Sequence, residues 1–426
     1  MRIAVVGAGW AGLACAVGAT RAGHAVTLYE AARQAGGRAR RIDDRLGVPL
    51  DNGQHILIGA YSATLALMRE VGVDRDTALL RLPLSLRFAD GGGLNVPASL
   101  PAPLDLLAGI ALARGWNWRD KMGLLRTALH WQRSGFRCAP ERTVAQLCAA
   151  LTPRVGNELI EPLCVSALNT PVAQASGEVF LRVLQDALFG ERGGADLLLP
   201  RVDLGALLPG PALRWLATRG TRLHMATRVQ AVTRQCPVTS TGWQVDGTEF
   251  DRIVLACPPW EAARIVRTAK LQEAASWLDR TEALQHESIA TVYAMAHGLR
   301  LRAPMLALRS NDEAPAQFVL DRGQLGGPVG LLAFVVSASN LPRDVLQAAV
   351  LRQASAQLGL QHDAVDALQT VVEKRATFAC TPALVRPALH IAPGLLACGD
   401  YVEGPYPATI EGAVRSGSNA ASAIDR

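Results

Sequence analysis

Three glycines near the start of the chain, Gly7, Gly9 and Gly12, have the spacing with which proteins bind the pyrophosphate of a dinucleotide. The first permits a tight turn, the second lets the backbone approach the phosphates, and the third lets the following helix pack closely on the strand. Glu30 follows about twenty residues later, where a carboxylate can bind the hydroxyls of a ribose. The turn residues that we expect at the cofactor are Gly7, Gly9, Trp10, Ala11 and Gly12. Small residues before a helix also serve ordinary turns, so the motif needs support from its context.

A second group of polar residues could do acid–base chemistry. Residues 51–55 (Asp-Asn-Gly-Gln-His) interrupt an apolar stretch and suggest a strand end that emerges at a site. Gln54 and His55 are our candidates to face a substrate, because an imidazole titrates near neutral pH and suits a proton donor. The alternative for His55 is a structural hydrogen bond inside the fold. Tyr401 and Tyr406 could line the same pocket, or could simply pack there.

The elements that must position these residues are a strand, a helix and a second strand. Residues 3–6 predict an apolar strand, residues 13–21 an alanine-rich helix, and residues 24–29 a second strand. This order is the βαβ unit of a Rossmann-like sheet. Segments 222–232, 243–245 and 252–257 predict a small β-meander that returns to the main sheet, or an ordinary pair of buried strands.

Two further motifs make the chain similar to a group of flavoproteins. Gly36-Gly37-Arg38 comes soon after Glu30, an element that a nicotinamide domain does not need. Near the other end, Gly399-Asp400 closes a short apolar strand, and a helix begins close to Thr409. Together these motifs resemble the FAD-binding fold of amine oxidases, carotenoid desaturases and protoporphyrinogen oxidases. The cofactor that we expect is therefore FAD.

The resemblance also implies a position for each matching residue. Arg38 would lie close to the pyrophosphate, Asp400 would bind the ribitol chain, and the helix start would meet the pyrimidine edge of the flavin. A backbone group at Val229 would read the adenine, and the segment after the arginine would run past the flavin ring. The cofactor-binding residues implied in this way are Gly36, Gly37, Arg38, Asn52, Gly53, Val229, Gly399, Asp400, Thr409 and Ile410.

Length and composition favour a two-domain enzyme. The chain has 426 residues, of which 50% are hydrophobic, and this is more than one core normally supports. Because the cofactor motifs are spread along the chain, we expect an α/β fold with a discontinuous, Rossmann-like FAD-binding domain. It would comprise residues 1–75, 205–265 and 385–426, including the meander. An inserted α+β substrate domain would comprise residues 76–204 and 266–384.

Charge and cysteine content exclude other classes of function. The net charge of +6 comes from scattered basic residues, without the basic run and interleaved aromatics of a nucleic-acid site. The eight cysteines show neither a CxxC pair nor metal-ligand spacing, so we expect no metal and a reducing, cytoplasmic compartment. We expect no signal peptide and no spanning helix.

Residues 94–118, with Arg114, Trp116 and Trp118, have the composition of an element at the inner membrane surface, or of a helix packed within the substrate domain.

Four longer blocks narrow the resemblance. Residues 51–61, 161–171, 197–201 and 406–417 look like the hydroxysqualene dehydroxylase family, also described as squalene-associated FAD-dependent desaturases. The similarity spans nearly the whole chain. The family implies that an allylic hydroxyl of hydroxysqualene leaves as water and that a hydride from reduced FAD replaces it, giving squalene for hopanoid and related synthesis.

That reaction makes physical demands. Hydroxide leaves poorly, so an acid must protonate it, and the allylic cation needs a dry apolar tunnel. We expect segments 163–168, 180–188 and 331–336 to line the tunnel, His55 or neighbouring Gln54 to deliver the proton, and Tyr406 to stack near the ring. The chain shows no second nucleotide motif, so a separate electron donor is expected. The alternatives are an oxidative carotenoid-type desaturase or amine oxidase, or a lipid carrier that has kept the fold.

Overall fold

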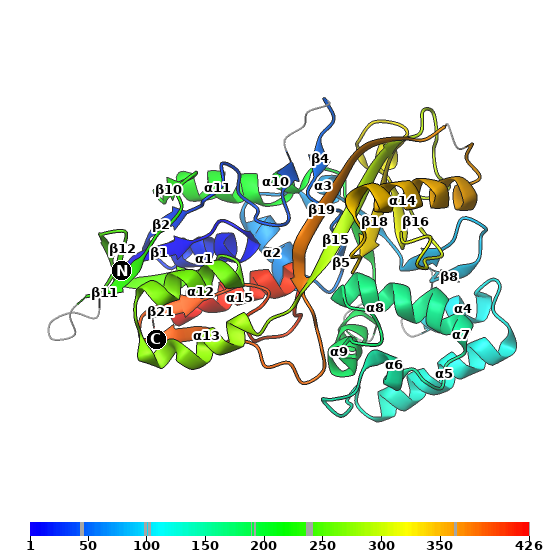
Figure 1. Cartoon of the computed structure of the whole chain (residues 1–426), viewed down its shortest axis with the longest axis horizontal. Coiled ribbons are helices and arrows are strands. Elements are labelled where there is room, and N and C mark those ends of the chain that lie inside the picture. The colour runs from blue at the N-terminus through cyan, green and yellow to red at the C-terminus, as the bar shows by residue number, and fades with distance from the viewer. Residues whose placement is uncertain are drawn as a thin grey trace.

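The computed structural model describes residues 1–425 except 43–46, 98–99, 101–103, 189, 191–192, 236–241 and 362–363. Both termini lie at one end of the molecule (Figure 1). Helices α4 (Leu104–Leu112), α5 (Trp118–Arg133) and α7 (Pro153–Val155) lie at the opposite end. The molecule is therefore elongated, with its first and last residues far from this helical end.

A largely parallel sheet carries the glycine turn. Its strands, in spatial order, are β10 (Arg222–His224), β2 (Ala25–Tyr29), β1 (Arg2–Val6), β14 (Arg252–Leu255), β21 (Leu395–Ala397) and β20 (His390–Ala392). The neighbouring strands are parallel except for the antiparallel pair β20 and β21. The predicted α/β fold with a parallel sheet is confirmed. The domain boundaries stay a prediction.

Helices cover both faces of this parallel sheet, and alternate residues of β1 point to opposite faces. Ile3 and Val5 pack in one core with α1 (Trp10–Arg21), α2 (Ser62–Glu70), α11 (Pro209–Ala217) and α15 (Ile410–Ala423). Ala4 and Val6 pack in another core with α12 (Pro259–Thr268) and α13 (Ala275–Glu282). Burial on both faces explains why the strands are continuous apolar runs.

The β-meander is shorter than the sequence predicts. It contains β11 (Val232–Arg234), β12 (Trp243–Val245) and β13 (Thr248–Phe250), paired antiparallel. The expectation of one meander strand over 222–232 was wrong, because β10 joins the parallel sheet beside β2. Ala226, with a φ of 52°, then turns the chain before β11. Alternating residues predict a strand but do not say which sheet it joins.

A second, antiparallel sheet stands beside the parallel sheet. Its strands, in spatial order, are β16 (Met305–Ala307), β17 (Phe318–Asp321), β18 (Leu331–Ser337), β15 (His286–Met295) and β19 (Asp366–Phe378). Helix α14 (Arg343–Leu358) packs on one face, where Leu346 and Val350 meet Val292 and Phe334. Figure 1 shows β15 and β19 as long strands that reach toward α15. These two strands bring the antiparallel sheet to the cofactor motifs.

The helical end and the connecting elements complete the fold. The helical end also contains α6 (Val144–Leu147), a π-helix (Gly156–Ile160), α8 (Glu161–Leu168) and α9 (Gly177–Leu188). The connecting elements are α3 (Arg75–Ala78), α10 (Leu204–Leu207), β3 (Arg41–Ile42), β4 (Leu50–Asp51), β5 (Leu57–Ile58), β6 (Leu79–Leu82), β7 (Ser85–Arg87), β8 (Gly93–Asn95), β9 (Leu197–Pro200) and 3₁₀ turns at Gln272–Ala274 and Arg322–Leu325.

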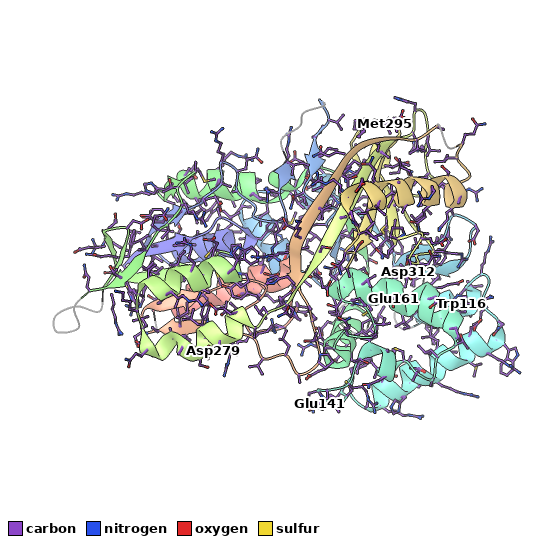
Figure 2. All side chains as sticks on the ribbon, in the orientation of Figure 1. Trp116, Glu141, Glu161, Asp279, Met295 and Asp312 are labelled. Atoms are coloured by element: carbon purple, nitrogen blue, oxygen red, sulfur yellow. The ribbon has the colours of Figure 1, made fainter. Side chains whose placement is uncertain are left out.

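The two tryptophans of segment 94–118 have different surroundings. Trp116, labelled in Figure 2, is buried and its Nε1 donates to Glu158 Oε2 at 2.9 Å. Trp118 begins α5 and is exposed. Trp116 therefore fits a helix packed inside the fold, and Trp118 fits a surface element. Within the described ranges, no helix combines the length and apolar composition that crossing a bilayer requires.

The cysteines that the structure describes are all free, and several lie in the core. Cys236 lies outside the described residues.

Candidate cofactor site

The glycine turn between β1 and α1 leaves no room for side chains. Gly7 has a φ of +116°, and a Cβ atom there would lie 2.7 Å from the carbonyl oxygen of Ala256. A Cβ on Gly12 would lie 1.9 Å from the Gly7 carbonyl oxygen. Trp10 and Ala11 are buried, and no side chain caps the N-terminus of α1. The first backbone N–H groups of the helix, with the positive end of its dipole, are therefore available to an anion.

The second pair of glycines lies against the first turn. Gly36 N–H donates to the Ala8 carbonyl at 2.8 Å, and the Cα of Gly37 lies 3.9 Å from where a Cβ of Gly9 would stand. Glu30 accepts hydrogen bonds from the N–H groups of Ala8 (2.7 Å) and Ala32 (2.8 Å). The structure thus brings both glycine motifs and the carboxylate to one cradle.

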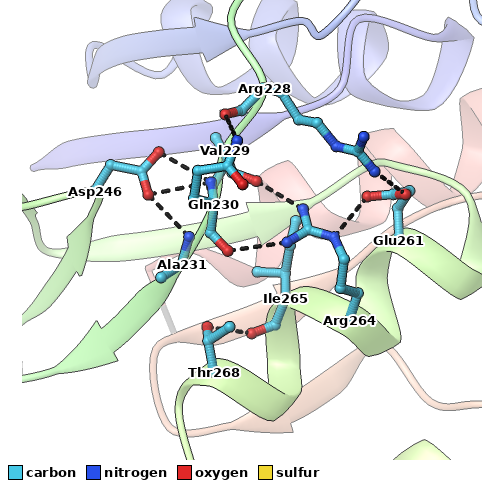
Figure 3. A network of polar contacts seen from close by, with 9 residues as sticks. All are labelled: Arg228, Val229, Gln230, Ala231, Asp246, Glu261, Arg264, Ile265 and Thr268. Atoms are coloured by element: carbon cyan, nitrogen blue, oxygen red, sulfur yellow. Dashed lines mark hydrogen bonds and ion pairs between the residues drawn. The ribbon is translucent and has the colours of Figure 1, made fainter.

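Val229 lies in the turn between β10 and β11, and its surroundings are drawn in Figure 3. Its carbonyl accepts a hydrogen bond from Arg264 Nη2 at 2.7 Å, and Arg264 pairs with Glu261. Asp246 accepts the N–H of neighbouring Gln230 at 3.1 Å. The Val229 N–H has no partner within the described part of the chain. The turn is therefore held from both sides while one backbone donor stays free for a base.

Arg38 and Asp400 form an ion pair. Arg38 Nη2 lies 2.5 Å from Asp400 Oδ1, and Nη1 donates to the Ala376 carbonyl at 2.5 Å. The Asp400 side chain is buried, whereas that of Arg38 is about one-third exposed. Ala376 belongs to β19, so this arginine links the parallel sheet, the antiparallel sheet and the C-terminal motif. The sequence predicted two separate contacts to FAD, and the structure adds a direct contact between them.

The N-terminus of α15 lies next to Asp400. Thr409 caps it by accepting the Gly412 N–H at 3.0 Å, so the N–H groups at Ile410 and Glu411 begin the helix. Gly399 donates its N–H to Ser416 Oγ at 3.0 Å. The helix start is thus fixed relative to the Gly399-Asp400 turn. Its free N–H groups and positive dipole end suit an electron-rich ring edge.

Glu411 in the first turn of α15 is completely buried, and its carboxylate caps α2. It accepts the N–H groups of Ala63 (3.0 Å) and Thr64 (2.9 Å) and the Thr64 hydroxyl (2.7 Å). Arg415 donates to its other side at 2.7 Å. This carboxylate therefore locks α2 to the start of α15.

Gln54 does not present a free amide to a substrate. Its Nε2 donates to the Tyr293 hydroxyl at 2.8 Å, and its Oε1 lies 3.5 Å from Arg322 Nη1. The Tyr293 hydroxyl in turn donates to the Asp51 carbonyl at 2.9 Å. We predicted that Gln54 would face the substrate, but both ends of its amide contact protein groups. These contacts give it a positioning role for residues 51–55.

His55 is part-buried and its Nδ1 lies 3.3 Å from the Gly53 carbonyl. Burial, assisted by the nearby Arg38 charge and opposed by the contact with Gly53, lowers the pKa of His55 from 6.5 to about 4. The ring is therefore neutral at neutral pH in the free protein. A neutral imidazole can orient a hydroxyl group, but it is not a ready source of protons.

The antiparallel sheet contributes residues that the sequence did not point to. Asn52 Nδ2 donates to Glu373 Oε2 of β19 at 3.2 Å. A Cβ on Gly53 would lie 3.9 Å from the hydroxyl oxygen of Thr291 in β15 and 3.8 Å from His55 Cε1. The buried Thr291 hydroxyl has no partner within the described residues. β-Branched residues are ordinary in strands, so Thr291 carried no signal in the sequence.

The three tyrosines near this site differ in role. Tyr401 is buried with its ring 2.6 Å from a Cβ built on Gly399, which fits the packing alternative, and its hydroxyl has no partner within the described residues. Tyr406 is part-buried under the guanidinium of Arg415, which stands 5.1 Å from its ring centre. Burial and the nearby Asp186 raise the pKa of Tyr406 to about 12.

Burial and the charge of Glu411 raise the pKa of Tyr61, which contacts Thr409. Tyr61 and Tyr406 thus flank the start of α15 and keep their protons.

Two adjoining cavities are lined by residues of α4, α9 and the segments around β6 and β8. One, of about 370 Å³, is within the usual size range of small-molecule pockets. Its wall includes Gly194 and Asp196, whose carbonyls accept the N–H groups of Ala60 and Gly59 at 2.9 Å. The second, of about 60 Å³, is lined by apolar side chains alone, including Leu163 and Leu184.

Three leucines line both cavities, which are therefore neighbours: Leu84, Leu106 and Leu188. Segments 163–168 and 180–188 thus contribute to these walls, whereas segment 331–336 forms β18 and lines neither. The wall of the larger cavity is hydrogen-bonded to Gly59 and Ala60, which precede Tyr61.

The residues present fit a flavin dinucleotide. Side chains at Gly9 and Gly37 would fill the space between the two turns, since a Cβ on Gly37 would stand 3.3 Å from Gly9 Cα. The free N–H groups of α1 suit a pyrophosphate, and Glu30 suits a ribose. The start of α15 and the unpartnered Thr291 hydroxyl suit the polar edge of a ring system. These groups come from the N-terminal βαβ segment, the antiparallel sheet and the C-terminal helix, and the Arg38–Asp400 ion pair joins the first of these parts to the last.

Comparison with known proteins agrees with this geometry. The family model described as flavin containing amine oxidoreductase matches residues 10–425. A protein of Rhodopseudomonas palustris named hydroxysqualene dehydroxylase is 28% identical to this chain, and the match covers 99% of this chain and 97% of that protein. A protein of the same name from Zymomonas mobilis is 25% identical, and the match covers 98% of this chain and 97% of that protein. An oxidoreductase from Methanosarcina mazei of known crystal structure superposes with a TM-score of 0.73 at 15% identity, covering both chains completely. At 15% identity, the similarity to the Methanosarcina mazei structure shows a shared fold alone.

Proposed function

We propose that this chain, which belongs to the family of flavin-containing amine oxidoreductases, catalyses the FAD-dependent reductive dehydroxylation of hydroxysqualene to squalene. The observation that carries the proposal is that relatives named for this reaction align with nearly the whole chain. The smaller, wholly apolar cavity and the leucines that it shares with the larger one support it, because an isoprenoid needs an apolar binding site.

The chain's own residues would hold FAD in and beside the cradle formed by the two glycine motifs and Glu30. We assign the adenosine to Glu30 and the Val229 N–H, the pyrophosphate to the first turn of α1 with Gly36, Gly37 and Arg38, and the ribitol to Asp400. The flavin ring would lie between Asn52, Gly53 and the start of α15 at Thr409 and Ile410. Reduced FAD, when bound, supplies a hydride.

The remaining task of the protein is to help the hydroxyl group leave. We assign the activation of the leaving hydroxyl group to His55. Gln54 positions segment 51–55 through its contacts with Tyr293 and Arg322. The pKa of His55 is about 4, so the ring enters the reaction neutral and orients the hydroxyl. The hydroxyl group needs one proton to leave as water. The ring would take this proton from solvent before the C–O bond breaks and pass it to the departing oxygen, whose growing negative charge favours the transfer, so that the imidazole ends neutral again. Tyr406, protonated and stacked under Arg415, would form part of the wall around the allylic cation.

The test is anaerobic turnover by the protein with chemically reduced flavin. We expect hydroxysqualene to be converted to a product that has lost one oxygen atom with no change in its number of hydrogens, because a hydrogen replaces the hydroxyl group; mass spectrometry against authentic squalene identifies it. Deuterium at flavin N5 would appear at the former hydroxyl carbon. Oxidised enzyme should give no product. Failure of the reduced enzyme to consume hydroxysqualene would refute the proposal.

An oxidative desaturase or amine oxidase remains the alternative. Such an enzyme would turn over with oxidised flavin and an external acceptor, and its substrate would carry no leaving hydroxyl. For an amine oxidase one expects an aromatic pair at the flavin, and the burial of Tyr401 behind Gly399 leaves Tyr406 as the candidate. The proposed reaction consumes reduced flavin, so we also propose a separate electron donor.

A further inference from the structure

Helix α4 is apolar on two opposite sides. Its inner side places Leu106 and Ile110 in the walls of the cavities. Its outer side exposes Leu107 (44% exposed) and Leu112 (70% exposed), together with Leu104. A helix that is apolar all round is normally buried on all sides. Within the described chain, nothing covers the outer side of α4.

Helix α5 continues this exposed surface at the same end of the molecule (Figure 1). Trp118, Met122 and Leu129 stand at positions i, i+4 and i+11, which share one face of a helix. All three are exposed, and Trp118 is 68% exposed. Leu124 and Trp131 point the other way, into the core. We call the exposed apolar residues of the two helices the α4–α5 surface: Leu104, Leu107, Leu112, Trp118, Met122 and Leu129.

Basic residues surround the α4–α5 surface. Residues 104–133 contain five Lys or Arg and two Asp or Glu, a local net charge of +3 (5 − 2). Arg114, Arg119, Arg126 and Arg133 are exposed. One of the two acids, Asp120, is buried and caps α5. Exposed leucine and tryptophan with a rim of arginine match a surface of acyl chains beneath anionic headgroups.

The larger cavity opens beside this surface. Leu100, Asp105 and Leu106 form its wall on the α4 side, and the ion pair between Arg81 and Asp196 (2.6 Å) stands in its wall on another side. The cavity therefore has α4 on one side and, on another, a wall that is hydrogen-bonded to the segment before Tyr61. Helix α4 separates the apolar outer surface from a cavity whose wall combines leucines with charged side chains.

We propose that the α4–α5 surface docks on an anionic lipid bilayer and that the cavity beside α4 takes its isoprenoid directly from the lipid. The docking itself depends only on the exposed side chains and their charge. The entry of substrate at this point rests on the proposed function. Lipid is the partner that we infer, because the apolar residues match the acyl chains of a bilayer and the basic rim matches its anionic headgroups.

The docking test is co-sedimentation of the flavin-loaded protein with vesicles. We compare phosphatidylcholine alone with phosphatidylcholine containing phosphatidylglycerol, without substrate. Wild type should bind the anionic vesicles and bind more weakly at high salt, because salt screens the arginine contribution. The double variant Leu112→Glu, Trp118→Glu should bind at least ten times more weakly.

The matched control carries the same charges elsewhere. Val329 and Val385 are 66% and 61% exposed, so Val329→Glu, Val385→Glu adds two carboxylates at similarly exposed apolar positions outside the α4–α5 surface. This control should bind vesicles like wild type, apart from a small uniform effect of net charge. Equal losses in both double variants, or no binding by wild type, would overturn the proposal. So would a dimer in solution that the Leu112→Glu, Trp118→Glu variant dissolves, because the surface would then join two copies.

Substrate entry is tested separately. With hydroxysqualene in anionic vesicles, the Leu112→Glu, Trp118→Glu variant should turn over at least ten times more slowly than wild type. With the same substrate in detergent micelles, the two should be equal, and their flavin content should match. Equal rates from vesicles would overturn entry through this surface. Absence of turnover by wild type in both media would refute the proposed reaction while leaving the vesicle-binding result intact.

Discussion

Arg38 and Asp400 stand 362 positions apart in the chain and meet at 2.5 Å. The sequence predicted a role for each from its own motif, because glycines, a basic residue and an acid after a strand have recognisable local patterns. It could not predict their contact, which depends on the parallel pairing of β14 with both β1 and β21. Substituting one member of this ion pair therefore tests the proposed cofactor site.

Replacing Asp400 with Asn should weaken FAD binding. The amide keeps the shape but loses the charge that Arg38 contacts, and a hydrogen bond to a charged group contributes about 1.5–3 kcal/mol, which is about a ten- to hundredfold change in affinity. Flavin fluorescence titration of the apoprotein measures it. Asp203→Asn, at a part-buried residue 3.8 Å from Arg41, is the control and should bind FAD normally. Equal affinity in Asp400→Asn and wild type would contradict the assignment.

His55 and Asp51 should respond to pH in opposite directions. The pKa of His55 is lowered by burial from 6.5 to about 4, so the unfolded chain takes up a proton first and the contribution of His55 to stability is lost as pH falls through this window. The pKa of Asp51 is raised by burial from 3.8 to about 6, so the folded protein takes up the proton first and acidification stabilises it.

Urea unfolding of single variants separates the two effects. Between about pH 7 and about pH 4, wild type should lose up to about 3 kcal/mol relative to His55→Gln, and should gain up to about 3 kcal/mol relative to Asp51→Asn. In wild type the two contributions largely cancel. A free energy difference between wild type and His55→Gln that does not change with pH would show that His55 titrates normally.

The chemistry of segment 51–55 was the least predictable part of the site. The residue types suggested reactivity for Gln54 and His55, but burial and partners decide it. Tyr293 and Arg322, which engage Gln54, come from the antiparallel sheet and from the 3₁₀ turn after β17, far along the chain. A single sequence does not reveal such contacts.

At the scale of elements, the contact between α1 and α15 sets the shape of the cofactor cradle. A Cβ on Gly417 would lie 2.0 Å from the Ala11 carbonyl oxygen, and one on Gly18 would lie 2.8 Å from the Ala421 Cβ. The two helices therefore approach almost to backbone contact. The glycine motif predicted close helix packing at Gly12, whereas no local pattern in the sequence predicted it at Gly417.

Substituting Gly417 by Ala should separate these helices. Because the obstacle is backbone, we expect a loss of about 3 kcal/mol in the free energy of unfolding, together with loss of flavin. Gly123, inside α5 with open space around its Cβ position, is the matched substitution. Gly123→Ala should stabilise the protein by about 1 kcal/mol through helix propensity. Chemical denaturation of both variants checks the opposite signs, and the same sign in both would contradict the packing argument.

Glu411 should be more important for stability than an exposed carboxylate. In Glu411→Gln the amide nitrogen cannot accept the hydrogen bonds from Thr64 or Arg415, so we expect a loss of about 2–4 kcal/mol. Glu70→Gln, which removes an exposed ion pair with Arg21, should cost at most about 1 kcal/mol. Thermal unfolding compares them. Similar shifts for the two variants would show that α2 is held by other contacts.

The elements themselves were largely predictable. The strand–helix–strand unit at the start follows from periodicity and glycine placement, and it is present as β1, α1 and β2. The segment 222–232 was divided wrongly because periodicity contains no information on the partner strand. The antiparallel sheet was covered only by a general expectation of an α+β insertion, since its long strands lack local motifs.

At the scale of the whole molecule, Leu188 at the end of α9 lines both cavities. Leu188→Trp should therefore obstruct the route, and we expect turnover of hydroxysqualene to fall at least tenfold while flavin content stays unchanged. Leu188→Ala, which enlarges the passage, should retain turnover. Steady-state rates with equal flavin loading measure the difference. Full activity in Leu188→Trp would mean that the isoprenoid takes another path.

The order of strands in the parallel sheet has a consequence for biosynthesis. Strand β14 stands between β1 and β21, which lie far apart in the chain. Asp400 and the whole of α15 follow β21. A ribosome must therefore synthesise all the residues from β1 to α15 before the nucleotide cradle can close. Until then the nascent N-terminal half exposes its apolar strands, a state in which chaperones guard against aggregation.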